Sequence, residues 1–157
     1  MSGPEPKVEA WRALLEAHAA VLDHLSAELE METSLPVTFY DVLLHLNEAP
    51  GRQLPMHELA ARVLISKSGL TRLVDRMTAE GLVERRRGDD DRRVVYAGLT
   101  ESGRTRLVGA APVHLRGIDE HFGRHLNEVE ADTLRTLLRR VADANGAKGN
   151  GVRSPRT

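Results

Sequence analysis

Apolar side chains recur through most of this chain at intervals of three and four residues, which is the spacing of one face of an α-helix. The first such stretch predicts a long amphipathic helix over residues 5–32. Its stripe consists of Trp11, Leu14, Leu15, His18, Leu22, Leu25 and Leu29. A second helix is predicted after Pro36, with Thr38 as its N-cap, and it ends at Pro50 and Gly51 because these residues interrupt helices.

The middle of the chain predicts two shorter helices joined by a tight turn at residues 64–65. Pro55 suits the first turn of the earlier helix, whose inward side chains are Leu59, Ala60 and Val63. Ser66 is a good N-cap for the later helix, and Gly81 is a typical stop. The inward stripe of the later helix is Leu70, Leu73, Val74 and Met77. This arrangement is a helix-turn-helix.

The period then changes from helix to strand. Residues 82–87 and 93–99 predict two strands of a β-hairpin, with the polar residues 88–92 at its tip. Thr100 is a suitable N-cap for a helix that runs to about His121 and is interrupted or bent near Pro112.

The end of the chain predicts one more helix and a tail. Asn127 and Glu130 form a capping box, and Gly146 ends this last helix. Its apolar stripe is Leu134, Leu137, Leu138 and Val141. Residues 147–157 lack periodicity and predict a disordered tail.

These elements predict a mainly α fold with a small two-stranded wing, in which a winged helix-turn-helix is joined to a helical dimerisation region. We expect residues 1–146 to form one unit. Its winged lobe spans residues 36–99, and its helical arm spans residues 5–35 and 100–146. The apolar stripes of the arm are too long for the small lobe to cover. They are therefore expected to pack on each other and on a second copy of the chain.

Charge is distributed unevenly over the 157 residues, although the formal net charge is only −1. Residues 1–51 carry 2 basic and 9 acidic side chains, residues 52–106 carry 12 and 8, and residues 107–157 carry 8 and 6. A local field rather than the total charge steers binding, because salt screens charges beyond about 8 Å. We therefore expect the basic lobe to meet DNA and the acidic first helix to point away from it.

Several classes of protein are excluded or disfavoured by composition. Cysteine is absent, which excludes disulfides and thiol chemistry. No apolar run approaches 18 residues, and the first residues lack the order of a signal peptide, so we predict a cytoplasmic protein without a membrane segment. No Ser-His-Asp order, glycine-rich phosphate loop or metal triad is present. We accordingly expect neither enzymatic activity nor a cofactor.

The outer face of the predicted recognition helix, residues 66–80, carries side chains that suit a DNA groove. Serine and threonine hydroxyls bond bases or phosphates, and arginine makes paired bonds to guanine. The candidate DNA contacts on this helix are Ser66, Lys67, Ser68, Thr71, Arg72 and Arg76. The alternative is an ordinary solvated helix face.

The wing, residues 82–99, adds further candidates. Arg92 and Arg93 stand at or beside the tip, where an extended arginine can enter a narrow minor groove. Asp91 is interpreted as an ion-pair partner that holds an arginine extended. The three aspartates 89–91 could instead form a solvated turn. A metal site is disfavoured because adjacent acids on a flexible tip cannot easily surround one ion.

Residues 58–104 resemble the core of the MarR family of bacterial transcriptional regulators. The motifs that carry the resemblance are ELA at Glu58, SKSGLTRLVDRM from Ser66, EGLVERR from Glu80, DRR from Asp91 and LTESG from Leu99. The resemblance implies a homodimer on a pseudo-palindromic operator, with recognition helices in major grooves about 34–36 Å apart and wings in the minor grooves. It also implies a repressor released by a small ligand, and an Asp91–Arg93 pair in the wing. A constitutive or activating regulator, or a winged-helix module that binds protein rather than DNA, remains open.

The sequence indicates candidate ligand-binding residues less clearly than candidate DNA contacts. The resemblance places ligands in the crevice between the helical arm and the winged lobe, where Trp11 could stack on an aromatic ligand or simply anchor the dimer. Arg12, His18 and His45 could line the same crevice. His121 and His125 are four residues apart with His114 upstream, but glycines interrupt them and no nearby carboxylate completes a ligand set, so no metal site is predicted. The absent cysteine excludes hydroperoxide sensing through a thiol.

Overall fold

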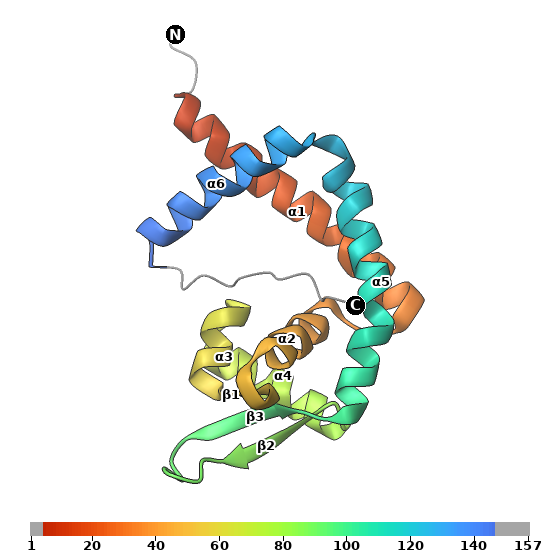
Figure 1. The fold of residues 1–157 in the computed structure, drawn as a ribbon, viewed down its shortest axis with the longest axis vertical. Coiled ribbons are helices and arrows are strands. Elements are labelled where there is room, and N and C mark those ends of the chain that lie inside the picture. The colour runs from red at the N-terminus through yellow and green to blue at the C-terminus, as the bar shows by residue number, and fades with distance from the viewer. Residues whose placement is uncertain (1–4, 147–157) are drawn as a thin grey trace.

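The computed structural model describes residues 5–146 and confirms the mainly helical class with a wing. The elements in chain order are α1 (Pro6–Thr33), α2 (Val37–Glu48), the 3-10 turn η1 (Pro50–Arg52), β1 (Gln53–Pro55), α3 (Met56–Val63), α4 (Lys67–Ala79), β2 (Val83–Arg87), β3 (Val95–Leu99), α5 (Glu101–His121), the 3-10 turn η2 (Gly123–His125) and α6 (Glu128–Ala144). The predicted tail at residues 147–157 lies outside the described residues. Figure 1 shows α2, α3, α4 and the strands gathered in one lobe, from which α1 and α5 lead away toward α6.

Three of the four predicted helix caps are confirmed. Ser66 Oγ accepts a hydrogen bond from the Gly69 amide at 3.1 Å, and Thr100 Oγ1 accepts one from the Gly103 amide at 3.0 Å. Asn127 and Glu130 form the predicted capping box at the start of α6. The prediction for Thr38 is wrong, because α2 already begins at Val37 and Pro36 occupies the N-cap position. The Pro36 carbonyl accepts from the amides of residues 39 and 40, so no cap from Thr38 is required.

The sheet has three strands rather than the predicted two. Its order is β1-β3-β2, and both pairs are antiparallel. The short strand β1 ends in Pro55, which cannot donate a ladder hydrogen bond, and it pairs Leu54 with Ala97 of β3. The hairpin β2–β3 is the predicted wing. Its second strand begins at Val95, two residues later than expected, so Arg93 belongs to the turn.

The core of the winged lobe is closed within one chain. Its apolar side chains come from α2, α3, α4 and the sheet, and Leu29 of α1 with Leu107 of α5 complete it. Gly103 lets the start of α5 reach the base of the wing, since a Cβ there would lie 2.0 Å from the Leu82 carbonyl oxygen. Gly103 is the glycine of the LTESG segment, and its missing side chain allows α5 to begin directly after the hairpin. The packing therefore connects the wing rigidly to the helix that leaves it.

Within the helical arm, α1 packs against α5. Arg116 of α5 pairs with Glu32 of α1, and Arg106 donates to the backbone carbonyls of residues 33 and 34 at 3.3 and 3.0 Å. The sequence predicts that the helix is interrupted or bent near Pro112. In the structure α5 continues through Pro112 without an interruption. Among the residues described, none of the helices has the length and apolar character needed to cross a membrane.

Apolar side chains of the arm remain in contact with solvent. The helix α6 buries none of its residues, and Trp11 of α1 is 59% exposed. The exposed apolar residues of the arm include Val8, Leu15, Leu22, Leu115, Ile118, Phe122, Val129, Leu137 and Val141. One chain thus leaves the predicted stripes of the arm largely uncovered.

Candidate nucleic-acid interface

The helix α4 presents a narrow, polar N-terminus. Ser66 caps it, and the hydroxyl oxygens of Ser66 and Ser68 lie 3.3 Å apart. Thr71 donates from Oγ1 to the Lys67 carbonyl at 3.0 Å, so its hydroxyl is held against the helix backbone. Small side chains and free helical amides at this end suit close approach to a phosphate or a base edge.

The two faces of α4 divide as predicted. The inward stripe of Leu70, Leu73, Val74 and Met77 is buried. The outward side chains are exposed, and they are Ser66, Lys67, Ser68, Thr71, Arg72, Asp75 and Arg76. Every predicted contact on this helix therefore lies on one solvent-facing surface.

Arg85 of β2 connects the wing to the recognition helix, and the sequence reasoning missed it. Its guanidinium lies 3.0 Å from Oδ1 of Asp75 and donates to the Thr71 carbonyl at 3.2 Å. The pair neutralises the one acidic side chain on the outward face of α4. Strand alternation is the signal that could have found Arg85, because it places this arginine and Arg87 on the same face of β2.

Arg76 has an internal contact. Its guanidinium carbon lies 5.2 Å from the ring centroid of the buried Phe39, which is a cation–π arrangement. This contact orients the arginine along the surface of the lobe. The contact with DNA predicted for Arg76 stays a prediction.

The wing tip is ordered by backbone contacts rather than by the predicted ion pair. The Asp91 carboxylate accepts from the backbone amide of Arg93 at 2.9 Å, which is an Asx-type turn. Within residues 5–146 no ion pair joins Asp91 to the guanidinium of Arg93, so that expectation is corrected. The physical reason is that one carboxylate oxygen is already held two residues along the chain. Arg87 also braces the turn by donating to the Arg92 carbonyl at 3.4 Å.

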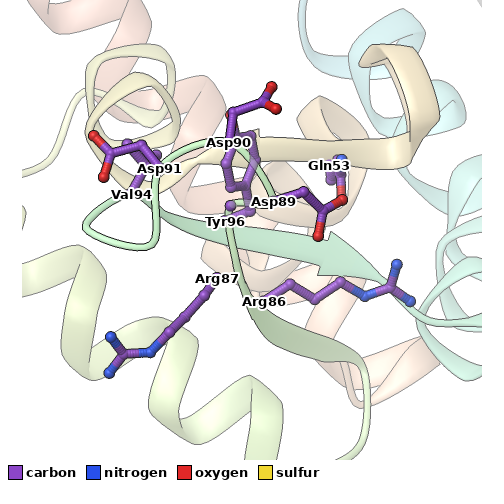
Figure 2. A pocket seen from close by; sticks show the side chains of 9 residues that line it. Gln53, Arg86, Arg87, Asp89, Asp90, Asp91, Val94 and Tyr96 are labelled. Atoms are coloured by element: carbon purple, nitrogen blue, oxygen red, sulfur yellow. The ribbon is translucent and has the colours of Figure 1, made fainter.

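A hollow of about 400 Å³ lies at the base of this tip, lined by Gln53, Arg86, Arg87, Gly88, Asp89, Asp90, Asp91, Val94 and Tyr96. Figure 2 shows the three aspartate side chains pointing in different directions, and Arg86 and Arg87 extending to opposite sides. The three carboxylates do not converge on one point (Figure 2).

Some basic side chains of this surface form ion pairs and others do not. Arg85 and Arg86 are paired with Asp75 and Glu84. Six exposed cations of this surface form no ion pair in the described part of the chain, and they are Lys67, Arg72, Arg76, Arg87, Arg92 and Arg93. An unpaired guanidinium or ammonium group is available to a phosphate, so the outward face of α4 and the wing tip together form an electropositive surface.

The four candidate sensing residues are not brought together within one chain. Trp11, Arg12 and His18 are exposed on the first half of α1, which Figure 1 places far from the lobe. His45 lies in α2, where burial and then the charge of Arg62 lower its pKa. A neutral imidazole at this position can donate or accept a hydrogen bond.

The premise that no carboxylate stands near the predicted histidines is wrong. Glu28 of α1 lies 2.5 Å from Nε2 of His121, and the ring of His24 stacks on the same imidazole. His114 instead faces Tyr40 of α2, and burial lowers its pKa. The three histidines singled out from the sequence therefore occupy different surroundings.

Comparisons with known proteins match this geometry. The family model described as MarR family matches residues 33–94. The chain is 28% identical to the HTH-type transcriptional regulator MhqR of Bacillus subtilis over 137 residues, which are 87% of this chain and 92% of that regulator.

Two solved structures from Streptomyces coelicolor resemble the whole described fold. Sco3205, a MarR family transcriptional regulator in complex with DNA, is 30% identical with a TM-score of 0.83, over 93% of this chain and 95% of that one. AbsC, another MarR family transcriptional regulator, is 28% identical with a TM-score of 0.83, over 92% and 97% of the two chains. The likeness thus includes the helical arm as well as the winged lobe.

Proposed function

This chain belongs to the MarR family of transcriptional regulators, and from that membership we propose that it binds a pseudo-palindromic DNA operator as a homodimer. The recognition helix α4 enters the major groove, and the wing enters the flanking minor groove. The residues assigned to groove contacts are Ser66, Lys67, Ser68, Thr71, Arg72, Arg92 and Arg93, with Arg76 on a phosphate. Asp91 positions Arg93 through its backbone amide.

The observation that carries this proposal is the single electropositive surface formed by α4 and the wing tip. Lys67 and Arg72 project from the helix, and Arg92 and Arg93 from the tip, all exposed and without an ion pair in the described residues. Of the acidic residues near this surface, Asp75 is paired with Arg85, whereas Asp89 and Asp90 stay exposed at the wing tip. The helix α1, which is acidic as a whole, extends away from the wing (Figure 1).

The helical arm supports the dimer. Residues 5–35 and 100–146 are proposed as the dimerisation region because their apolar stripes remain exposed in one chain. A second copy supplies a matching surface by symmetry, and burial of both stripes stabilises the pair by the hydrophobic effect. Two recognition helices then meet half-sites about 34–36 Å apart.

We also propose that the regulator is a repressor released by a small molecule bound between the arm and the lobe. Within one chain Trp11 and Arg12 lie on the half of α1 that is far from the lobe (Figure 1), so the proposal places the first helix of the second copy beside this crevice. Its exposed indole can stack on a ligand and its guanidinium is a cation, so an aromatic carboxylate is the chemical class that suits them. His45 contributes a neutral imidazole from the lobe side. A panel of aromatic acids, added to the operator complex, tests this proposal, and a panel in which none shifts binding contradicts it.

The experiment for DNA binding measures fluorescence anisotropy on the region upstream of the chain's own gene, at several salt concentrations. The logarithm of affinity is expected to fall linearly with the logarithm of salt concentration, because phosphate contacts release counterions. Arg93→Ala should weaken binding by roughly tenfold and reduce the slope by about 1. Arg124→Ala, which removes an exposed arginine of η2, is the matched control and should leave both values unchanged. A salt-independent affinity would instead favour a protein-interaction module.

A further inference from the structure

Three metal-ligating side chains meet where α1 crosses the end of α5. Glu28 belongs to α1, and Glu120 and His121 belong to the last turn of α5. One ligand atom from each of the three lies within 4.8 Å of the other two. Donor atoms around one zinc ion are about 3.2–3.5 Å apart, so side-chain adjustments of the order of 1 Å bring this set to bonding distance.

The carboxylate of Glu28 is incompletely satisfied. Its Oε1 atom is 2.5 Å from Nε2 of His121, while its Oε2 atom is buried and has no hydrogen-bond partner. A buried carboxylate oxygen without a partner is costly, because it has lost its water. A cation beside this oxygen would remove that cost.

The surrounding residues position the cluster. Gly117, one turn before His121 on α5, lets the two helices approach, since a Cβ there would lie 2.6 Å from Leu25 Cδ2 and 3.1 Å from Glu28 Oε2. The His24 ring stacks on His121 with centroids 4.4 Å apart and planes 10° apart, which holds the imidazole in one orientation. Both features favour a fixed ligand geometry over a mobile surface pair.

We propose that Glu28, Glu120 and His121 bind a divalent first-row transition-metal ion, for which Zn²⁺ is the probe. One imidazole and two carboxylates form a three-ligand set that leaves a fourth position for water. The imidazole nitrogen favours a transition metal over Mg²⁺ or Ca²⁺, which take oxygen ligands. On binding, the ion replaces the hydrogen bond between His121 and Glu28. The proton that Nε2 shares with the Glu28 carboxylate leaves this atom, by release to solvent or by transfer of the ring proton to Nδ1, so that Nε2 gives its lone pair to the metal and the neutral ring carries its one proton on Nδ1.

The test is isothermal titration of the metal-free full chain with ZnCl₂ in the absence of DNA, so it succeeds or fails independently of the proposed operator binding. We expect saturable binding by the wild type. His121→Asn and Glu120→Gln should each weaken it by about tenfold to a hundredfold, since each removes one of three ligands. Because Glu120 is exposed, Glu120→Gln should leave the fold intact. This variant therefore tests the proposal even if the His121 variant does not fold.

Two matched controls separate the cluster from general metal affinity. His125→Asn removes a histidine four residues beyond His121, and Asp119→Asn removes the carboxylate next to Glu120. Both controls should bind zinc as the wild type does. The proposal is overturned if the wild type shows no saturable zinc binding. It is also overturned if the Glu120→Gln variant binds zinc as tightly as the Asp119→Asn variant does, or if Mg²⁺ competes with zinc on equal terms.

Discussion

In the winged lobe the large apolar side chains are shielded from solvent, whereas in the helical arm many of them are exposed. Leu43 of α2 has no exposed surface, while Leu15 of α1 is 48% exposed and Val141 of α6 is 57% exposed. Both regions are built from helices with the same three- and four-residue stripes. One chain therefore closes the core of the lobe, to which the arm contributes Leu29 and Leu107, and leaves the apolar stripes of the arm exposed.

A leucine-to-alanine substitution should change the free energy of unfolding by very different amounts in the two regions. Leu43→Ala is expected to lower the free energy of unfolding by about 2–5 kcal/mol, because it leaves a cavity in a closed core. Leu15→Ala should cost less than about 1 kcal/mol in dilute protein, since its side chain already contacts water. Urea denaturation of both variants measures the difference, and equal losses would contradict the comparison.

A charge on the exposed stripe of α6 should break the arm without unfolding the lobe. Leu137→Asp is expected to weaken the dimer by at least about a hundredfold, roughly 2.7 kcal/mol, because the carboxylate would be desolvated at the interface. Sedimentation equilibrium measures the association. Arg139→Asp on the same helix is the control, and a Leu137 variant that remains as dimeric as this control would remove the arm from the interface.

Ionisation of Asp41 in α2 should make the stability of the lobe depend on pH. Burial raises the pKa of this carboxyl group from 3.8 to about 6. Because the folded-state pKa lies above the unfolded value, the charged form costs stability above about pH 6, and this cost disappears as the pH falls to about 4.

Asp41→Asn should accordingly stabilise the fold by about 1–2 kcal/mol at pH 8 and have little effect near pH 4, allowing for partial screening by solvent. Thermal unfolding across this pH range measures it. A stabilisation that does not change with pH would show that the ionised carboxylate is not its cause.

The smallest expected effect on stability concerns the contact between the wing and α4. Arg85→Met should change the free energy of unfolding by less than about 1 kcal/mol, because the Arg85–Asp75 pair is partly exposed. Operator affinity should nevertheless fall about three- to tenfold, since Asp75 becomes an unpaired acid on the DNA-facing surface.

Adding Asp75→Asn to the Arg85 variant should restore much of that affinity by removing the unpaired charge. Anisotropy titrations of the two single variants and the double variant complete the cycle. A double variant that binds no better than Arg85→Met would assign Arg85 a direct contact with DNA instead of a positioning role.

Local features of this chain were predictable because they are decided within a few residues. The buried stripe of α4 depends on the spacing of its apolar residues. The Ser66 cap and the capping box at Asn127 depend on hydrogen bonds between residues three positions apart. The two wing strands followed from the change of period. Thr38 was assigned wrongly for a related reason, since a proline two residues earlier offered the helix another start.

Long-range features were not predictable from local pattern. The strand β1 is only three residues long, and it exists through its pairing with β3 some forty residues later. Arg85 reaches Asp75 only because the hairpin folds back on α4, and Glu28 meets His121 across 93 residues of sequence.

The amino-acid sequence alone was enough to predict the order of the helices and of the two wing strands, three of the four N-caps and the basic face of the recognition helix, because each depends on neighbouring residues. Which charged groups pair depends on the packing of distant segments and is known from the three-dimensional structure. The packing of α4 against the wing pairs Asp75 with Arg85, and Lys67 and Arg72 on the same face of α4 form no ion pair in the described chain. The same packing leaves the arm exposed, since the stripes of α1 and α6 find too little apolar surface to cover them within one chain.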